Sequence, residues 1–144
     1  MSFVRDVLRD KGRDVATIDR EATVREAAER MHGRHIGALV VLSGGQVVGI
    51  FTERDLLNRV IAERLDPDVT GVGEVMTDRV AFCTSDTPLS VCRTAMTQNR
   101  IRHLPVMEDG RLSGMISSGD ILARELADHQ ETIRYMHEYM HGAV

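Results

Sequence analysis

The sequence predicts a mixed α/β (α+β) fold in which two pseudo-symmetric strand–helix–strand–strand–helix units pack together and an extended C-terminal helix follows. Three observations lead to this prediction. The chain repeats itself at an offset of about 65 residues, which indicates two copies of one structural unit. Apolar residues follow strand and helix spacing in the same order in both copies. The composition, 42% apolar and 28% charged over 144 residues, is typical of a globular core.

The repeat is visible in individual residues. Shifting the chain by about 65 positions aligns about ten identical residues over roughly forty positions without a gap, where unrelated sequence would match at two or three. The pairs include Met31 with Met96 and Asp55 with Asp120. Because one copy cannot bury both faces of its own sheet, we expect the two copies to form one cooperative module.

The match extends upstream into a lead-in segment before each copy. Residues 4–8 align with residues 72–76 once three residues, around Lys11 to Arg13, are taken as an insertion in the first copy. The predicted organisation is therefore a first domain over residues 4–65, a second over 72–127 and a helical tail over 128–144. Leu65 to Gly73, which contains Pro67 and Gly71, is the predicted linker.

The predicted strands occupy corresponding positions in both copies. A short extended segment comes first, at Val15–Ile18 and again at Val80–Cys83. Each copy then has a hairpin with a tight turn rich in glycine. The predicted hairpins are Ile36–Leu42 with Val47–Phe51 around Ser43-Gly44-Gly45, and Ile101–Met107 with Leu112–Ile116 around Asp109-Gly110.

Two helices are predicted per copy. Thr23 and Glu26 form the pattern of a capping box, and Thr87 is the expected cap of the matching helix, with Pro88 at its first helical position. The second helix of each copy is predicted from an apolar face. Its members are Leu56, Leu57, Val60, Ile61 and Leu65 in the first copy and Ile121, Leu122, Leu126 and Ile133, in a longer helix, in the second.

Composition excludes several functional classes. Aromatic residues make up 3% of the chain, there is no Trp, and the formal charge is −4. Nucleic-acid binders need clustered cations or aromatic stacking surfaces, so nucleic-acid binding is not expected. The start of the chain is too charged for a signal peptide and no apolar run has the length of a membrane span. We therefore expect a cytoplasmic protein without membrane contact.

The two cysteines, Cys83 and Cys92, are predicted to be free thiols. Cys83 falls in an expected strand and Cys92 on the apolar stripe of a helix. A role as small buried apolar residues is the main interpretation, with redox or metal chemistry as the alternative.

Each copy ends its last strand with the same pattern: Gly, two apolar residues, Thr or Ser, two variable residues and Asp. The pattern spans Gly49 to Asp55 and Gly114 to Asp120. One interpretation is structural, because a hydroxyl and a carboxylate both stabilise a helix N-terminus. The other is ligand binding, because a helix N-terminus suits a phosphate and a carboxylate can accept hydrogen bonds from a ribose diol. The residues alone leave both open.

These features resemble the CBS-domain family, and the resemblance covers nearly the whole chain. It is carried by the duplicated Gly-x-x-[Thr/Ser]-x-x-Asp ends, by the lead-ins at Val4 and Val72, and by the hairpin segments at 36–41 and 101–106. The resemblance implies a tandem CBS pair, or Bateman module, that binds AMP, ADP, ATP or another adenosyl compound such as NAD. In such pairs two clefts lie between the copies, with the Asp of one copy on the ribose and strands of the other around the adenine.

The resemblance assigns residues to both clefts. The cleft with Asp55 would use Ile50, Thr52, Arg54, Asp55, Val80, Ala81, Phe82, Ile101, Arg102, His103 and Pro105, although His103 could face either cleft. The cleft with Asp120 would use Val15, Ala16, Thr17, Ile36, Gly37, Ala38, Met115, Ser117 and Asp120.

The two clefts are not expected to be equivalent. Glu53 and Arg54 of the first copy become Ser118 and Gly119 in the second. Arg54 could pair with a phosphate in a forked geometry, so the Asp55 cleft is predicted to prefer a charged phosphate. The Asp120 cleft is predicted to be weaker or to take a different group.

The tail beyond the repeat carries its own signals. His137 and His141 are four residues apart and would share a helix face, a weak metal signal. Ile133, Met136 and Met140 continue an apolar stripe, with Tyr135 and Tyr139 nearby. A contact surface, either in a homodimer or against the module itself, is the main interpretation of this stripe, with fraying and metal binding as alternatives, and no metal site is assigned.

Catalysis is not predicted. The sequence contains no Walker loop, Gly-x-Ser-x-Gly, His-Glu-x-x-His or Cys-x-x-Cys motif, and its histidines lack an evident nucleophile as partner. CBS pairs are usually attached to an enzyme, channel or transporter, and no such segment is present. The resemblance therefore implies a stand-alone CBS-domain protein, with a ligand-sensing module that regulates an unidentified partner. The alternative is a structural dimer with vestigial clefts.

Overall fold

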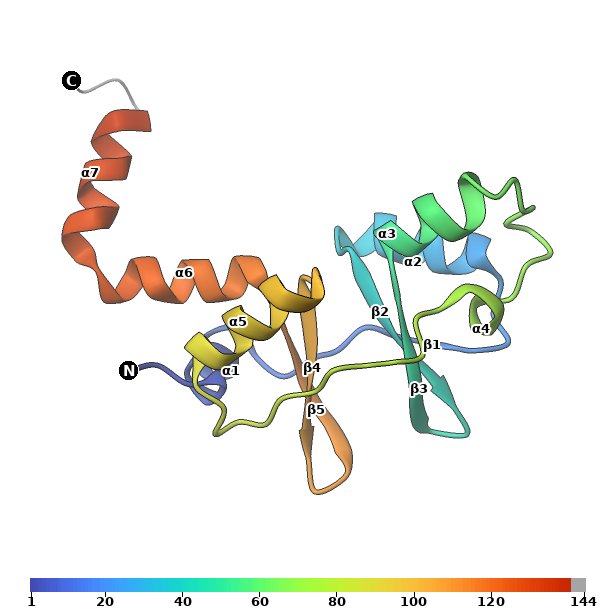
Figure 1. Ribbon diagram of the computed structural model, residues 1–144, viewed down its shortest axis with the longest axis horizontal. Coiled ribbons are helices and arrows are strands. Elements are labelled where there is room, and N and C mark those ends of the chain that lie inside the picture. Colours follow the sequence, from blue (N-terminus) through green and yellow to red (C-terminus); the bar gives the residue numbers. More distant parts are fainter. Residues whose placement is uncertain (141–144) are drawn as a thin grey trace. The chain divides into compact units, whose positions relative to one another are not determined.

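The computed structural model describes residues 1–140 and divides into two compact units. The first-repeat unit is Asp14–Ala81. The second-repeat unit combines Met1–Arg13 with the chain from Phe82 onward. Both contain a small sheet and helices, so the predicted mixed α/β class is confirmed, and Figure 1 labels the elements of each unit.

The first-repeat unit holds a three-stranded sheet of order β1-β2-β3. β1 pairs with β2 in parallel and β2 pairs with β3 antiparallel. The elements in chain order are β1 (Thr17–Asp19), α2 (Val24–Arg34), β2 (Ala38–Ser43), β3 (Gln46–Thr52), α3 (Glu53–Asp55), the π-helix η1 (Leu56–Ile61) and α4 (Val72–Val75).

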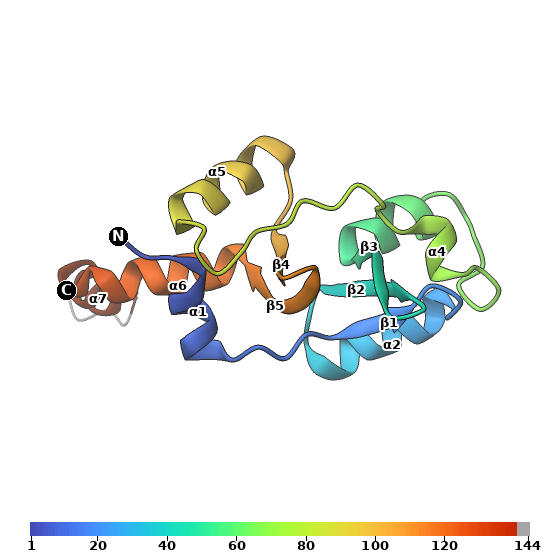
Figure 2. The same ribbon diagram turned by 90° about the horizontal axis from the view of Figure 1, so that it is seen from below.

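The second-repeat unit is built around the antiparallel pair of β4 and β5. Its elements are α1 (Val4–Lys11), α5 (Leu89–Asn99), β4 (His103–Glu108), β5 (Arg111–Ser117), α6 (Ser118–Asp128) and α7 (Gln130–Met140). Figure 2 shows α1 next to α6, where residues far apart in the sequence meet.

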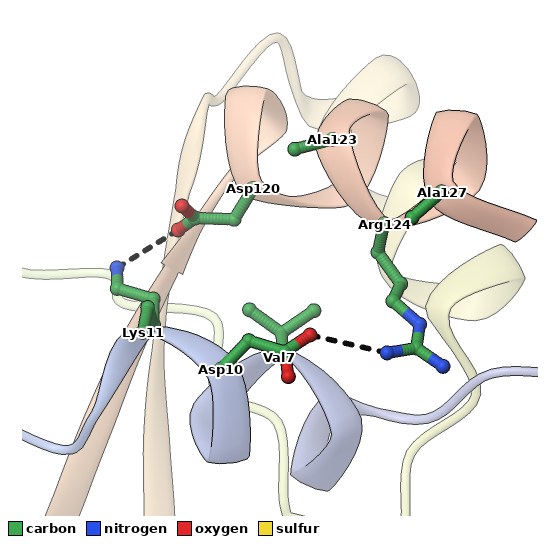
Figure 3. Close-up of a pocket in the computed structure, with 7 residues that line it drawn as sticks. All are labelled: Val7, Asp10, Lys11, Asp120, Ala123, Arg124 and Ala127. Atoms are coloured by element: carbon green, nitrogen blue, oxygen red, sulfur yellow. Dashed lines mark hydrogen bonds and ion pairs between the residues drawn. The ribbon is translucent and has the colours of Figure 1, made fainter. Parts of the chain in front are cut away.

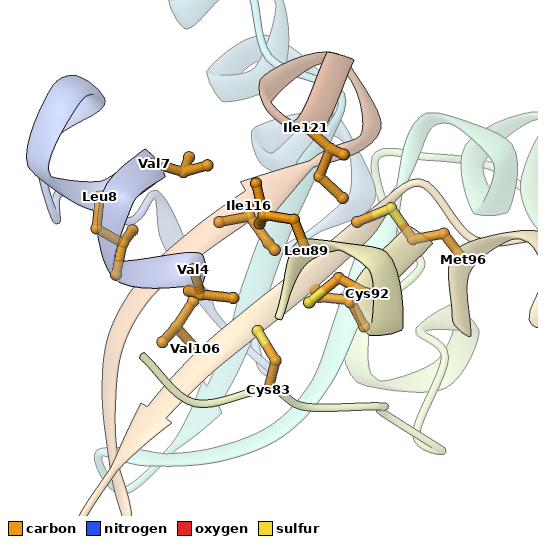
Figure 4. Close-up of a cluster of buried hydrophobic side chains, with 11 residues drawn as sticks. Val4, Val7, Leu8, Cys83, Leu89, Cys92, Met96, Val106, Ile116 and Ile121 are labelled. Atoms are coloured by element: carbon orange, nitrogen blue, oxygen red, sulfur yellow. The ribbon is translucent and has the colours of Figure 1, made fainter. Parts of the chain in front are cut away.

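The lead-in segments are exchanged between the repeats. Val4, Val7 and Leu8 of α1, which precedes the first repeat, are buried in the core of the second-repeat unit (Figure 4). Val72 and Val75 of α4, which precedes the second repeat, are buried in the core of the first-repeat unit. Each compact unit therefore combines one repeat with the lead-in of the other. The domain boundaries derived from the repeat stay a prediction.

The glycine of each repeated motif makes this exchange possible. A Cβ atom on Gly114 would lie 2.8 Å from Cδ2 of Leu8 in α1. A Cβ on Gly49 would lie 2.5 Å from Sδ of Met76 and 2.7 Å from the carbonyl oxygen of Thr77. Both distances are shorter than van der Waals contact. At Gly114 the Leu8 side chain would have to shift, whereas at Gly49 the rigid backbone carbonyl of Thr77 leaves no room for a side chain where the exchanged lead-in crosses.

The predicted hairpins are confirmed, and the two copies share their details. Gly44 and Gly45 have φ of 57° and 81°, and Asp109 and Gly110 have φ of 50° and 75°. Two successive residues with positive φ are typical of the type I′ turn that suits a two-residue hairpin. Both hairpins also change register at the matching position, between residues 41 and 42 and between 106 and 107.

The predicted strand Val80–Cys83 is wrong, because only Cys83 makes a bridge to β4. In the first copy the Val40 N–H donates to the carbonyl oxygen of Ala16. In the second copy the residue that matches Val40 is Pro105, which has no N–H to donate. At the other end, Ser85 donates its N–H to the carboxylate of Glu108 at 2.7 Å. The parallel pairing is thus stopped on both sides of Cys83.

The predicted cap of α2 is confirmed in part. Thr23 Oγ1 accepts a hydrogen bond from the Glu26 N–H at 3.2 Å. The predicted start of α5 is wrong by one residue, because Pro88 is the N-cap and Leu89 the first helical residue. Thr87 turns back instead, and its hydroxyl accepts from the Thr84 N–H at 3.0 Å.

The apolar face predicted after β3 is divided. Val60 is fully buried, whereas the side chains of Leu57 and Ile61 are 61% and 57% exposed. This segment is a π-helix, in which each N–H reaches five residues back and the turn is wider than in an α-helix. Apolar residues placed at the spacing of an α-helix therefore do not share one face of this wider helix.

The single extended C-terminal helix predicted after β5 is also wrong. The chain leaves the helical conformation at His129, with φ −125° and ψ 76°, and this residue separates α6 from α7. Ile121 and Leu126 lie in α6, and Ile133 in α7. An apolar pattern repeats over whole turns, so it cannot detect a break of one residue. His141 lies outside the described residues.

Both cysteines are free and buried, as predicted, with exposures of 6% for Cys83 and 1% for Cys92. They lie in the same core cluster (Figure 4). The hydrogen bond with Cys92, followed by burial, raises the pKa of the Cys83 thiol well above its ordinary value. Cys83 therefore stays protonated and packs as an apolar residue.

Gly49→Ala is predicted to destabilise the protein by about 1–3 kcal/mol, because the added methyl group overlaps Met76 and the rigid carbonyl of Thr77. Gly33→Ala, in α2 with no atom within 4 Å of the added Cβ, is the matched control and should stabilise by up to about 1 kcal/mol. Urea unfolding measures both. Equal stabilities of the two variants would contradict the close approach of the lead-in.

Candidate functional site

The repeated motif forms a capping box at the start of the helix after each sheet. In the first copy the Asp55 N–H donates to Thr52 Oγ1 at 3.2 Å, and the Thr52 N–H donates to Asp55 Oδ2 at 3.0 Å. In the second the Asp120 N–H donates to Ser117 Oγ at 3.1 Å, and the Ser117 N–H donates to Asp120 Oδ2 at 2.8 Å. The structural interpretation of the motif is therefore correct in both copies.

Beyond the box, Asp55 is held by two side chains of its own unit. Thr77, just after α4, donates its hydroxyl to Asp55 Oδ1 at 3.0 Å. Arg59 Nε lies 3.6 Å from the same oxygen. The Asp55 side chain is only 8% exposed, so this carboxylate is nearly buried among neutral and cationic donors.

Asp120 has a different partner. The ammonium of Lys11, the last residue of α1, lies 2.8 Å from Asp120 Oδ2 and also donates to the carbonyl oxygen of Met115 at 2.9 Å. The Asp120 side chain is 24% exposed and that of Lys11 is 36% exposed. The second carboxylate is therefore more accessible than the first and carries a direct ion pair.

Lys11 takes the place that Thr77 occupies in the other unit. Thr77 donates its N–H to the carbonyl of Ile50, which matches Met115 in the repeat, and its hydroxyl to Asp55. Lys11 makes the corresponding two bonds, to Met115 and Asp120, with one ammonium. One lead-in thus presents neutral donors to the motif carboxylate and the other a full positive charge.

The insertion in the first lead-in accounts for this difference. α1 has eight residues and α4 has four, so the inserted residues add about one helical turn. Gly12 then ends α1 with φ of 92°. Lys11 is the last residue of the added turn and reaches β5 through its side chain, whereas after α4 the backbone itself pairs with β3.

The arginines at matching repeat positions also differ. Arg59 lies near Asp55 and donates to the carbonyl of Met76 at 2.9 Å. Arg124 instead forms ion pairs with Asp10 at 3.1 Å and with Asp128 at 3.4 Å. In the first copy the arginine at this position lies near the motif carboxylate. In the second copy the cation next to the motif carboxylate is Lys11, and Arg124 pairs elsewhere.

A cavity of about 190 Å³ lies between α1 and α6 (Figure 3). The Lys11–Asp120 pair stands at one end and the Arg124–Asp10 pair at the other. Its apolar lining consists of Val7, Ala123 and Ala127. The motif carboxylate of the second copy, Asp120, therefore lines the same cavity as two cations, Lys11 and Arg124.

The environment of Asp120 shifts its acidity. Burial works to raise the pKa of Asp120, but the hydrogen bonds from Lys11 and the Ser117 N–H, with the charge of Lys11, bring it below the ordinary 3.8. Asp120 is therefore ionised at neutral pH and can accept hydrogen bonds from a ligand hydroxyl.

The structure places the sequence-predicted site residues in both units. Those of the first-repeat unit are Val15, Ala16, Thr17, Ile36, Gly37, Ala38, Ile50, Thr52, Arg54, Asp55, Val80 and Ala81. Those of the second-repeat unit are Phe82, Ile101, Arg102, His103, Pro105, Met115, Ser117 and Asp120. Each predicted cleft draws on both units, so its assembly stays a prediction. Within a unit, the Thr52–Asp55 and Ser117–Asp120 pairs are brought together.

Sequence reasoning missed four residues that surround the carboxylates: Lys11, Arg59, Thr77 and Arg124. Arg59 and Arg124 are identical at the repeat offset, which was an available signal. Lys11 lay in the recognised insertion, but its contact with Asp120 depends on the exchange of lead-ins, which the repeat does not reveal.

Within residues 1–140, no three His, Cys, Asp or Glu side chains are grouped in a way that could hold a metal ion. Over the same residues, no helix combines the length and the apolar character that a membrane crossing requires.

Comparison with known proteins identifies the family. The family model described as "CBS domain" matches twice, over residues 4–62 and 72–127. The chain belongs to the CBS-domain family. The two matches correspond to the two repeats with their lead-ins, so the sequence resemblance is confirmed and the fold is a CBS pair.

Two relatives illustrate how far the similarity extends. The mitochondrial CBS domain-containing protein CBSX3 of Arabidopsis thaliana is 33% identical over 150 residues, which cover 96% of this chain and 72% of the relative. The crystal structure of the CBS-domain protein ATU1752 from Agrobacterium tumefaciens is 41% identical, with a TM-score of 0.83, and covers 86% of this chain and 99% of that one.

Two further structures of CBS proteins carry additional information. The CBS pair of MJ0100, 25% identical with a TM-score of 0.77, was solved in complex with 5′-methylthioadenosine and S-adenosyl-L-methionine. The structural match covers 89% of this chain and 98% of the MJ0100 chain. A CBS-CP12 protein from bloom-forming cyanobacteria, 28% identical with a TM-score of 0.74, is hexameric and covers 85% of this chain and 70% of that one.

Lys11→Met is predicted to raise the pKa of Asp120, because burial remains while the ammonium that lowers the pKa is removed. In the wild type, ionised Asp120 stabilises the fold at neutral pH, and this contribution is lost as the pH falls through the lowered pKa. In the variant this contribution should be smaller, because the folded-state pKa of Asp120 no longer lies as far below its unfolded-state value. A carbon-13 NMR titration of the carboxyl group measures the pKa, with Arg13→Met as control. An unchanged pKa in Lys11→Met would contradict the ion pair.

Proposed function

We propose that this CBS pair is an adenine-nucleotide-binding regulatory module that senses energy state or another ligand, is not a catalyst, and acts on a partner protein. Its ligand would be AMP, ADP, ATP or another adenosyl compound such as NAD. Binding would regulate the partner only if the two conformational states of the module bind the ligand unequally.

The observation that carries the proposal is the duplicated carboxylate at a helix start. Asp55 and Asp120 are each fixed by a capping box, beside the Thr52 or Ser117 hydroxyl. A fixed carboxylate can accept two hydrogen bonds from a ribose diol without reorganisation. The complex of the related MJ0100 pair with two adenosyl compounds supports this ligand class.

The charges near the two carboxylates favour nucleotides over cationic ligands. Arg59 lies near Asp55, and Lys11 and Arg124 lie near Asp120. The sequence also places Arg54 beside Asp55 and Arg102 in the cleft assigned to Asp55 by the resemblance. Lysine and arginine both bind phosphate, so an anionic adenosyl ligand suits these surroundings.

A second candidate is a structural or regulatory dimer with vestigial clefts. It is favoured by the state of Asp55, which is nearly buried and accepts hydrogen bonds from Thr52 and Thr77. In addition, within the described residues no fully buried side-chain nitrogen or oxygen lacks a hydrogen-bond partner. The capping role alone would then explain the motif.

A homodimer is proposed as the assembly. Leu57 and Leu122 match in the repeat and are 61% and 57% exposed, and in α7 Tyr139 and Met140 are 70% and 75% exposed. Exposed large apolar side chains commonly mark contact surfaces. Sedimentation velocity should therefore give twice the chain mass for the wild type and a monomer for Leu57→Glu with Leu122→Glu. A monomeric wild type would contradict the proposal.

Isothermal titration calorimetry with AMP, ATP, NAD, 5′-methylthioadenosine and S-adenosyl-L-methionine tests ligand binding. At least one should bind the wild type, and Asp55→Ala or Asp120→Ala should weaken it about 10- to 100-fold through the lost charged hydrogen bonds. Asp86→Ala is the control, since its carboxylate is 89% exposed and pairs with Arg5. Absence of binding by every compound would favour the structural dimer.

A further inference from the structure

The ion pair between Lys11 and Asp120 sets a condition on any ligand of the second carboxylate. Lys11 already donates to Asp120 Oδ2, the oxygen that also accepts the Ser117 N–H. A ribose that binds this carboxylate has to share it with the ammonium or displace it. At Asp55 the direct side-chain donor from the lead-in is the uncharged Thr77 hydroxyl, and the cation Arg59 lies farther away, at 3.6 Å, and also donates to the carbonyl oxygen of Met76.

Lys11 is able to move away from the carboxylate. Its side chain is 36% exposed at the C-terminal end of α1, and a four-carbon stem carries its ammonium. The matching donors in the first-repeat unit are less mobile, because the Thr77 N–H is fixed in a backbone bridge to Ile50. Displacement is therefore a specific possibility of the Asp120 site.

Displacement by an uncharged nucleoside leaves the ammonium without its anion. A ligand with a phosphate near the ribose supplies a new anion, so the ammonium exchanges one charged partner for another. The cavity beside the ion pair offers room for that group, and Arg124 lines its other end (Figure 3). Arg124 is 27% exposed and pairs with Asp10 and Asp128, which are 63% and 38% exposed, so a phosphate would have to compete with these two carboxylates for Arg124.

We propose that Lys11 is a specificity-determining residue that makes the Asp120 site select adenosyl ligands carrying a phosphate over the uncharged nucleoside. The inference rests on the proposed adenosyl-binding function and adds the ligand class of one site. It also assigns a phosphate partner to the site that the sequence predicts to be weaker or to take a different group. That prediction compared Glu53 and Arg54 with Ser118 and Gly119 and did not include the lead-in.

AMP and adenosine form the matched ligand pair for the test, because they differ only in the phosphate. Amide signals of residues 117–120 in a nitrogen-15 NMR titration report on the Asp120 site, and those of residues 52–55 report on the other. In the wild type, the 117–120 signals should show AMP binding at least about tenfold tighter than adenosine.

Lys11→Met should reduce this ratio to near one by changing the two affinities in opposite directions. The affinity for AMP should fall, because the phosphate loses a cationic partner. The affinity for adenosine should rise, because its ribose no longer competes with an ammonium for Asp120. Lys11→Arg should keep the preference, and Arg13→Met, which removes a charge two residues away, should leave it unchanged. A purely structural role of Lys11 would instead weaken both ligands together.

The outcomes separate this inference from the function on which it rests. An unchanged AMP preference in Lys11→Met, or AMP signals confined to residues 52–55, would overturn the role of Lys11 while adenosyl binding stands. No response of either region to AMP or adenosine in the wild type would overturn the inference, and if the remaining adenosyl compounds also fail, the proposed function falls with it.

Discussion

The crossing of each lead-in over the last strand of the other repeat is the constraint on which the rest of the structure depends. The crossing is close at Gly49 in one unit and at Gly114 in the other, and at Gly49 the backbone of the lead-in itself excludes a side chain. It buries the lead-in valines in both cores. It also brings Thr77 to Asp55 and Lys11 to Asp120, so the interaction that completes the fold also decides the surroundings of the motif carboxylates.

Divergence between the lead-ins makes the two sites chemically different. About one additional helical turn in α1 places an ammonium where the other unit has a threonine hydroxyl and a backbone N–H. The repeat supplies a carboxylate at both positions, and the lead-ins then adjust its charge balance and exposure. In a pair of this kind, an insertion distant in sequence can change the charge and exposure around a carboxylate of the repeated motif without any change to the motif.

The sequence predicted the features that recur in both copies, and it failed where one residue acts alone. Hairpins, glycine turns and both capping pairs follow local rules that a repeat reinforces. The strand at Val80–Cys83 failed because Pro105 removes one N–H from an otherwise matching pattern, and the long C-terminal helix failed because His129 alone leaves the helix. Lys11 could not be assigned to Asp120, because a repeat aligns positions with their equivalents and gives no information on which copy a lead-in packs against.

Native mass spectrometry of the purified protein, before and after addition of AMP, is the decisive measurement of adenosyl binding by the two motif carboxylates. We expect that an adenosyl compound is retained, or that added AMP binds at a defined stoichiometry. Loss of that bound mass in the variant lacking both carboxylates, Asp55→Ala with Asp120→Ala, would tie it to the repeated motif. A protein that shows only its own mass with every adenosyl compound would rule out adenosyl binding and leave the carboxylates as helix caps.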